Sequence, residues 1–118
     1  MKTLLAILCL VSSTSFAVER VDCHDEKNQW TVTYQLDGTV VTDLTFTKNS
    51  EIFKQFPGSL VANATRVLGR TYFEIAFAEF SYFDFDRRKM NPEFSGEFLL
   101  QNNPIGFETP VNCVASPL

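Results

Sequence analysis

Residues 71–86 read TYFEIAFAEFSYFDFD, and they decide the fold class of this chain. Seven of these sixteen residues are Phe or Tyr, and no Gly, Pro or Asn lies among them. Phe73, Ile75 and Phe77 alternate with smaller or charged residues, which is the two-residue period of a half-buried strand. The stretch therefore predicts a β-strand against which the rest of the chain packs.

The alternation changes phase in the second half of this stretch. Phe80 falls on the opposite parity from Phe73, whereas Phe83 and Phe85 return to the first parity. A single straight strand of this length would far exceed the usual five or six residues. Because no turn residue lies inside the stretch, we favour a bend at a β-bulge over residues 78–81, and not a hairpin.

This bulge allows two interpretations of the polar residues beside it. In the first, they face an interior cavity, and the candidate ligand-lining residues are Phe73, Ile75, Phe77, Glu79 and Ser81. In the second, the bulge turns Glu79 and Ser81 toward solvent. The second is favoured because lone buried carboxylates are uncommon.

Residues 1–17 predict a secretory signal peptide. A positive start at Met1-Lys2 is followed by an apolar run and by Ser15-Phe16-Ala17, a small-x-small cleavage site. The apolar run is shorter than the roughly twenty residues that a membrane-spanning helix needs, so no membrane span is expected. Cleavage near Ala17 leaves residues 18–118 as a single small β domain, secreted or periplasmic.

Charge argues against nucleic acid as a partner. The chain has 10 Lys and Arg against 14 Asp and Glu, and loss of Lys2 with the signal peptide brings the formal net charge from −4 to about −5. Affinity for nucleic acid begins with a basic face. The one concentration of positive charge is Arg87, Arg88 and Lys89, a predicted loop that is either a candidate contact for an anion or a protein partner, or a solvated loop.

Two cysteines remain after cleavage, and they predict one disulfide. Cys23 lies near the start of the mature chain and Cys113 near its end, and paired cysteines are typical of exported proteins. The bridge would join the first strand to the last. The alternative is two separate buried thiols. No metal site is expected at the adjacent His24, because the chain has no second His.

Residues 30–47 predict a β-hairpin. Trp30 and Tyr34 belong to the apolar face of its first strand. A two-residue turn would put the apolar sets of the two strands on opposite faces, so the pattern favours a three-residue loop at residues 36–38. That loop would place Tyr34 opposite Val40.

Residues 50–56 predict one or two helical turns. Ile52, Phe53 and Phe56 have helical spacing, and Ser50 is a suitable N-cap. A strand over residues 60–68 follows, and Asn63 begins an Asn-Ala-Thr sequon that a eukaryotic secretory pathway could glycosylate.

The last third of the chain predicts two more strands. The first covers residues 93–101, with Gly96 marking a bulge or a close backbone approach. The second covers residues 107–114, where Pro110 favours an edge or a barrel seam, and a tail follows it. Counted this way, about seven or eight strands form a small antiparallel β-barrel, with a β-sandwich as the alternative.

The sequence carries no motif for catalysis. It has no nucleophile elbow and no Gly-rich phosphate loop, so we expect neither an enzyme nor a cofactor. Two functions remain. One is an exported binding module for a small apolar ligand or a protein partner, and the other is a secreted structural or inhibitor-type protein with a packed core that acts through exposed loops.

Overall fold

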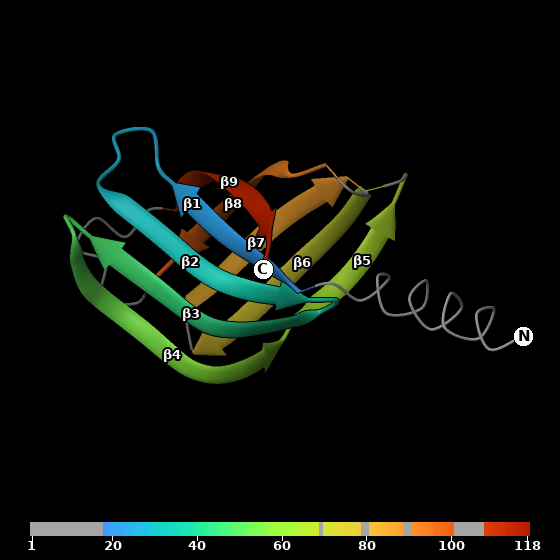
Figure 1. Cartoon of the computed structure of the whole chain (residues 1–118), viewed down its shortest axis with the longest axis horizontal. Helices are drawn as coiled ribbons and strands as arrows, with labels where there is room; N and C mark the ends of the chain where they lie inside the picture. Colours follow the sequence, from blue (N-terminus) through green and yellow to red (C-terminus); the bar gives the residue numbers. More distant parts are fainter. Residues whose placement is uncertain (1–17, 69, 79–80, 89–90, 101–107) are drawn as a thin grey trace, which may run out of the picture.

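The structure is a computed structural model that describes residues 18–118 except 69, 79–80, 89–90 and 101–107 (Figure 1). Every regular element in these residues is a strand of one nine-stranded antiparallel sheet. The strands are β1 (Glu19–His24), β2 (Trp30–Asp37), β3 (Val40–Lys48), β4 (Glu51–Val61), β5 (Asn63–Val67), β6 (Arg70–Ala78), β7 (Ser81–Arg88), β8 (Glu93–Leu99) and β9 (Thr109–Pro117).

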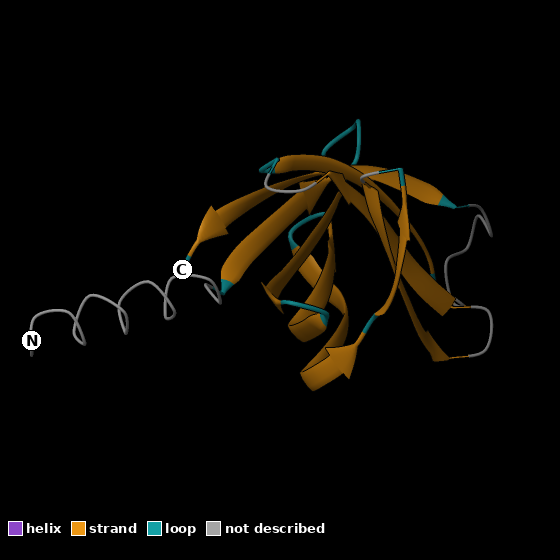
Figure 2. Cartoon of the chain, turned by 90° about the vertical axis from the view of Figure 1, so that its right-hand side faces the viewer, coloured by secondary structure: helices purple, strands orange, loops and turns teal. Residues whose placement is uncertain are grey.

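The sheet curls into an open half-barrel (Figure 2). Its strand order is β4-β3-β2-β1-β9-β8-β7-β6-β5, so two meanders meet where β1 pairs with β9. The outermost strands are β4 and β5, which are consecutive in the chain and separated by Ala62. The all-β prediction is confirmed. The predicted count of seven or eight strands is too low, partly because the predicted strand over residues 60–68 is interrupted at Ala62.

The stretch over residues 71–86 is a hairpin, so the prediction of one bulged strand is wrong. β6 and β7 run antiparallel, with Phe73 opposite Phe85 and Ile75 opposite Phe83. All four side chains are buried. The return of the first parity in the second half is therefore a consequence of cross-strand pairing, because residues directly opposite each other share a face.

The reversal lies where the sequence shows no turn residue. Ala78 pairs with Ser81, so the connection is residues 79–80, which lie outside the described residues. Tight hairpins favour Asn and Gly at such positions, and their lack led to the wrong interpretation. A register shift between Ala76 and Ala78 shows that a bulge does occur beside the turn.

The hairpin of β2 and β3 is confirmed, but its loop has two residues and not three. Asp37 pairs with Val40, which leaves Gly38 and Thr39 as the loop. Gly38 has a φ of 61°, a left-handed conformation that glycine adopts without steric cost. The predicted pairing of Tyr34 with Val40 is therefore wrong.

A two-residue loop alone would put the apolar side chains of β2 and β3 on opposite faces of the sheet. A bulge inside β3 avoids this. The register shifts between the pairs Gln35–Thr42 and Thr33–Thr45, and Asp43 has a φ of 55°. The extra residue moves the later apolar side chains of β3 to the inner face. As a result Val41, and not Val40, is buried before the bulge.

Residues 50–56 belong to β4, so the predicted helical turns are wrong. Asn49 and Ser50 have φ values of 50° and 67°, and Lys48 pairs with Glu51. Two consecutive left-handed residues form the tight turn that joins twisted antiparallel strands. Ser50 is thus a turn residue of the β3–β4 hairpin and not a helix cap.

Aromatic rings join the two halves of the curled sheet. The ring centroids of Phe46 and Phe98 are 5.1 Å apart, those of Trp30 and Phe98 5.1 Å, and those of Tyr34 and Phe83 5.5 Å. These pairs connect β2 and β3 with β7 and β8, which are not neighbours in the sheet. The inner face of the sheet therefore packs on itself.

The predicted disulfide is confirmed. Cys23 of β1 and Cys113 of β9 are paired directly across the strands, with sulfurs 2.01 Å apart. Both residues are buried. The bridge therefore joins the two meanders at the centre of the sheet.

The end of the chain belongs to the sheet. β9 continues through Ala115 to Pro117, so the predicted tail is wrong. Pro110 pairs with Glu97 of β8, while the pairing of β9 with β1 begins only at Asn112. Pro110 thus lies in a central strand, but in the part of that strand that does not pair with β1.

Gly96 is a site of close backbone approach, as one of the two sequence-based alternatives proposed. A Cβ atom at Gly96 would lie 2.8 Å from the carbonyl oxygen of Asp84 on the neighbouring strand. That separation is too short for any side chain without movement of the backbone.

Candidate functional site

The predicted ligand-lining aromatic residues contact other side chains of the core. Phe73 stacks on Phe85 with ring centroids 4.6 Å apart. Phe77 lies 4.4 Å from Phe56 and 5.8 Å from Phe46 between centroids. Ile75, between them in sequence, is 2% exposed. These three side chains face inward as predicted, but aromatic rings already cover Phe73 and Phe77.

The two polar residues of the same prediction are not brought together in the described structure. Ser81 is buried at the start of β7. Glu79 lies outside the described residues. The favoured interpretation, in which Ser81 turns toward solvent, is therefore wrong for this residue, and the inward-facing aromatic rings beside it pack on other rings.

Of the predicted cationic cluster, the structure describes the side chain of Arg87 alone. Arg87 points into the half-barrel and is 7% exposed, because it shares the inward parity of Phe83 and Phe85. Arg88 is the last residue of β7, and Lys89 lies outside the described residues. Arg87 is therefore not an exposed docking residue, which corrects that part of the prediction.

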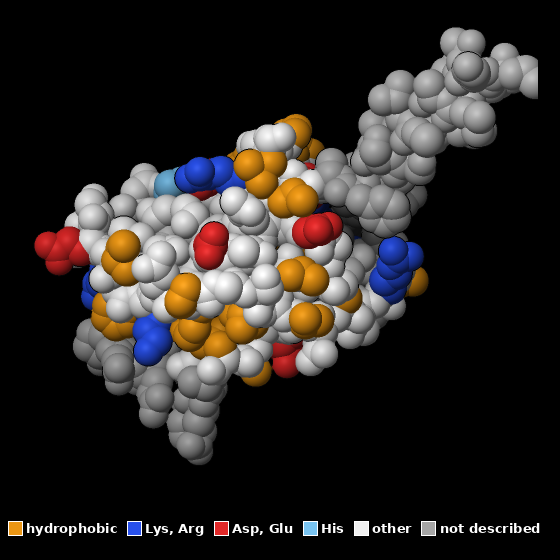
Figure 3. Space-filling model, turned by 60° about the horizontal axis from the view of Figure 1, so that its bottom comes forward, with side chains coloured by type: hydrophobic (Ala, Val, Ile, Leu, Met, Phe, Trp, Pro, Cys, Tyr) orange, Lys and Arg blue, Asp and Glu red, His pale blue; other side chains and the backbone are white. Residues whose placement is uncertain are grey.

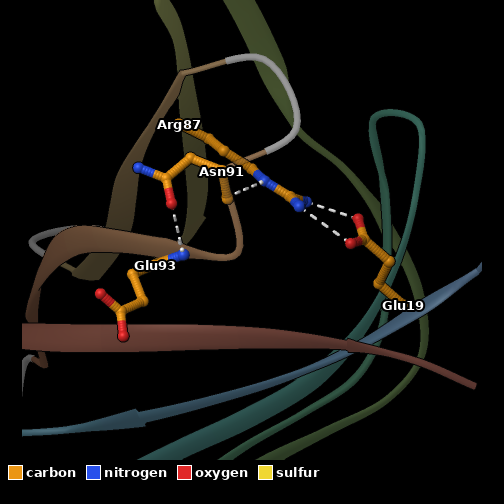
Figure 4. A network of polar contacts seen from close by, with 4 residues as sticks. All are labelled: Glu19, Arg87, Asn91 and Glu93. Carbon is orange, nitrogen blue, oxygen red and sulfur yellow. Dashed lines mark hydrogen bonds and ion pairs between the residues drawn. The ribbon is translucent and has the colours of Figure 1, made fainter.

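Arg87 of β7 instead pairs with a carboxylate of β1, a strand that is not its neighbour in the sheet (Figure 4). Its guanidinium donates two hydrogen bonds to Glu19 of β1, one of them over 2.8 Å from Nη2 to Oε2. Nε donates to the carbonyl oxygen of Asn91 over 3.1 Å, and the guanidinium carbon lies 5.4 Å from the ring centroid of Phe94. This hydrogen-bonding lowers the pKa of Glu19 below its usual value. Sequence reasoning did not single out Glu19.

An acidic row crosses the outer face of β6, β7 and β8. Glu74, Asp84 and Glu97 lie directly opposite one another on these strands. A shallow hollow of about 310 Å³ borders the row, lined by residues that include Tyr72 and Asp86. A second hollow of about 490 Å³ adjoins it on the β5 side. The exposed sequon residue Asn63 lines this second hollow, and its glycosylation stays a prediction.

Burial and mutual repulsion perturb the acidic row. Desolvation raises the pKa of Asp84 to about 6, and the charges of Glu74, Glu97 and Glu108 add to the shift. Desolvation, followed by the charge of Glu108, also raises the pKa of Glu97. Like charges directly opposite each other destabilise a sheet. The ionised row is therefore a destabilising feature of the folded chain.

We expect the protein to be more stable near pH 5 than near pH 8. The folded-state pKa of Asp84, about 6, exceeds the usual Asp value of 3.8, so the folded state binds the proton more tightly. The resulting stabilisation is complete below pH 3.8 and is lost as the pH rises through 6. Urea denaturation at pH 5 and 8 measures it.

Two features keep this measurement specific. The ion pair of Glu19 has the opposite dependence, since its contribution is lost only as the pH falls below the usual Glu value of 4.5. The variant Asp84→Asn should show a smaller change in unfolding free energy between pH 5 and 8. An equal change in variant and wild type would contradict the assignment to Asp84.

The second exposed feature is the outermost strand, β4. Ile52 is 64% exposed and Phe53 is 37% exposed, and Phe56 and Phe77 are half-buried beside them. Figure 3 views the molecule from the side on which β4 lies in Figure 1, and it shows apolar side chains across this face. We call Ile52, Phe53, Lys54, Phe56 and Phe77 the β4 seam.

The backbone of β4 is paired on one side only. Within the described part of the chain, its ladder partner is β3 alone. Such an edge carries unpaired N–H and C=O groups that can pair with another strand. Pro57 has no N–H and Gly58 has a φ of 89°, so the edge before this break is residues 51–56. The register shifts within it at Phe53, since Thr47 pairs with Ile52 and Phe46 with Lys54. Sequence reasoning missed this edge because it assigned these residues to helix.

Two lysines lie at this edge, Lys54 within the seam and Lys48 on the neighbouring strand β3. Lys54 Nζ lies 5.8 Å from the ring centroid of Phe56, and Lys48 Nζ lies 5.3 Å from that of Trp30. The ion pairs found among the described residues involve neither lysine. The seam thus combines apolar side chains with the positive charge of Lys54 and of the neighbouring Lys48.

No protein-family model, curated protein or solved structure matches this chain. In the residues that the structure describes, there is no helix of the length and apolarity needed to cross a membrane. Over the same residues, no group of three His, Cys, Asp or Glu side chains is placed to hold a metal ion.

Proposed function

We propose that this chain is an exported protein-binding module with a packed core, whose partner binds its outer surface. The observation that carries the proposal is the combination of a filled aromatic interior with an exposed apolar edge at β4. Large exposed apolar patches are typical of interaction sites. No catalysis and no cofactor are part of the proposal.

Export rests on two features. The signal peptide predicted over residues 1–17 would direct the chain out of the cytoplasm. The disulfide between Cys23 and Cys113 is compatible with an oxidising compartment, where such bonds persist. Both the periplasm and the extracellular space meet this condition.

The packed interior favours a protein partner over a small apolar ligand. An interior ligand would need space beside Phe73, Ile75 and Phe77, where Phe46, Phe56 and Phe85 already lie. Displacing these rings would cost the burial of several aromatic side chains. The protein partner was one of the two alternatives within the sequence-based hypothesis.

An environment-sensitive apolar dye tests the interior. We expect the folded protein to increase the fluorescence of the dye only through surface binding at the β4 seam. The variant Ile52→Lys should remove that surface component. Dye fluorescence that persists undiminished in Ile52→Lys, in protein that remains folded, would indicate an interior ligand site and contradict the proposal.

Site-specific photocrosslinking tests for the partner. A photoreactive side chain is placed at Ile52 on β4, at Tyr72 beside the acidic row, or at Leu68, which is 98% exposed. After irradiation in the producing cell, we expect a defined protein adduct at one surface and none at Leu68, identified by mass spectrometry. If neither Ile52 nor Tyr72 yields a specific adduct, the chain is not a protein-binding module.

A further inference from the structure

We infer that residues 51–56 of β4 bind an extended segment of a partner protein that carries apolar and acidic side chains. The segment would add to the sheet as a tenth strand beside the β4 seam. This inference rests on the proposed function, and it specifies the surface and the chemistry of the partner. Three independent features of the seam lead to it.

The first feature is the backbone. An exposed strand edge offers alternating N–H and C=O groups, which an extended peptide can satisfy in full by strand addition. The edge over residues 51–56 has the length of an ordinary strand and contains one register shift, at Phe53. β5, at the other end of the sheet, has only five residues, and its exposed described side chains include no large apolar group.

The second feature is the placement of apolar side chains around this edge. Ile52 pairs with Thr47 on the outer face of the sheet. Phe56 pairs with the inward-facing Leu44 and contacts Phe77. An added strand projects alternate side chains to the two faces. One side would therefore meet Ile52, and the other would meet the half-buried rings.

The third feature is charge. Lys48 and Lys54 stand over aromatic rings at the margin of the seam, and neither is in an ion pair within the described residues. Carboxylates of a partner would meet two unpaired cations here, whereas a basic partner would meet Glu51 as the one carboxylate on residues 51–56. Complementary charge sets partner preference and association rate. The acidic row across β6, β7 and β8 would repel the same partner, which confines it to β4.

Synthetic peptides test this inference on the folded mature protein. The probe is a fluorescein-labelled peptide of about eight residues in which valine and glutamate alternate. One comparison peptide replaces glutamate by lysine, and a second keeps every side chain but is N-methylated throughout. Fluorescence anisotropy gives the Kd, and amide hydrogen exchange locates the bound surface.

We expect the acidic peptide to bind about tenfold more tightly than the basic one at low salt, and to slow exchange within residues 51–56. The N-methylated peptide should not bind, since it has no backbone donors. The double variant Lys48→Gln, Lys54→Gln should remove the preference for the acidic peptide. Ile52→Lys should weaken binding, whereas the matched exposed substitution Leu68→Lys should leave it unchanged.

Several results would overturn the inference. These are equal binding of the acidic and basic peptides, binding of the N-methylated peptide, and protection that lies outside β4. Crosslinked adducts at Tyr72 but not at Ile52 would also overturn it, while leaving the proposed protein-binding function intact. Adducts at neither position would refute the proposed function itself.

Discussion

Replacing Cys23 and Cys113 together by alanine should lower the free energy of unfolding by about 4 to 5 kcal/mol. The sequence separation of 90 residues means that the closed loop includes most of residues 18–118. The unfolded chain therefore gains a large conformational freedom when the bridge is absent. Since small domains have total stabilities of about 5 to 15 kcal/mol, the variant should be marginally stable. Urea denaturation monitored by Trp30 fluorescence measures the loss.

The position of the bridge explains why its removal should be felt at the centre of the fold. β1 and β9 form the junction between the two meanders, and the other covalent connection between these is Ala62. Reduced wild-type protein is the control, because it keeps both cysteine side chains in place. It should match the double alanine variant to within about 1 kcal/mol. Equal stability of the oxidised and reduced wild type would contradict the expected role of the disulfide.

Features that do not depend on strand register were predictable from the sequence. Cys23 and Cys113 could be paired by counting, because only two cysteines remain after the predicted cleavage. The alternation of Phe73, Ile75 and Phe77 was sufficient to predict a strand with that inner face. A period of two identifies which residues share a face, but it does not fix where the chain turns.

The errors arose where turns and bulges produce the same pattern. A change of parity results from a bulge, as at Asp43, and also from a chain reversal, as between Ala78 and Ser81. The sequence-based interpretation placed a bulge at the reversal, and it assumed a three-residue loop at residues 36–38 in place of the bulge at Asp43. The usual discriminator is a Gly or Asn at the turn, and residues 79–80 have neither.

The candidate site was less predictable than the fold because it depends on which strand lies at the edge of the sheet. Nothing local distinguishes Ile52 and Phe53 on an outer strand from the same residues on one helical turn, since both patterns bring apolar side chains together. Which strand is outermost depends on pairing over the whole chain. The inward position of Arg87, in contrast, was available in the sequence, because Arg87 continues the parity of Phe83 and Phe85.

Replacing Arg87 by methionine should lower the free energy of unfolding by about 3 kcal/mol. The side chain of Arg87 is 8% exposed and that of Glu19 is 25% exposed, so the variant leaves a carboxylate partly buried without its partner. The variant also removes the hydrogen bond to the Asn91 carbonyl and the contact with the ring of Phe94. Because Glu19 retains some access to water, the loss should lie at the lower end of the range for buried pairs.

Two variants separate the ion pair from a general effect of losing a long side chain. Arg20, whose side chain is 63% exposed, pairs with Asp22 over 3.5 Å, and Arg20→Met should change stability by less than about 1 kcal/mol. In the double variant Glu19→Met, Arg87→Met no buried charge remains, and part of the stability should return. If Arg87→Met costs no more stability than Arg20→Met, the pair between Arg87 and Glu19 behaves as a surface contact.

Acidification provides an independent readout of the same pair. In the wild type Arg87 holds the pKa of Glu19 below its usual value of 4.5, so the contribution of the pair is present above that pH and is lost as the pH falls through the lowered value. Arg87→Met abolishes this shift. The difference in unfolding free energy between wild type and variant should therefore be largest near pH 6 and should shrink toward pH 3, as protonation removes the charge that the guanidinium stabilises.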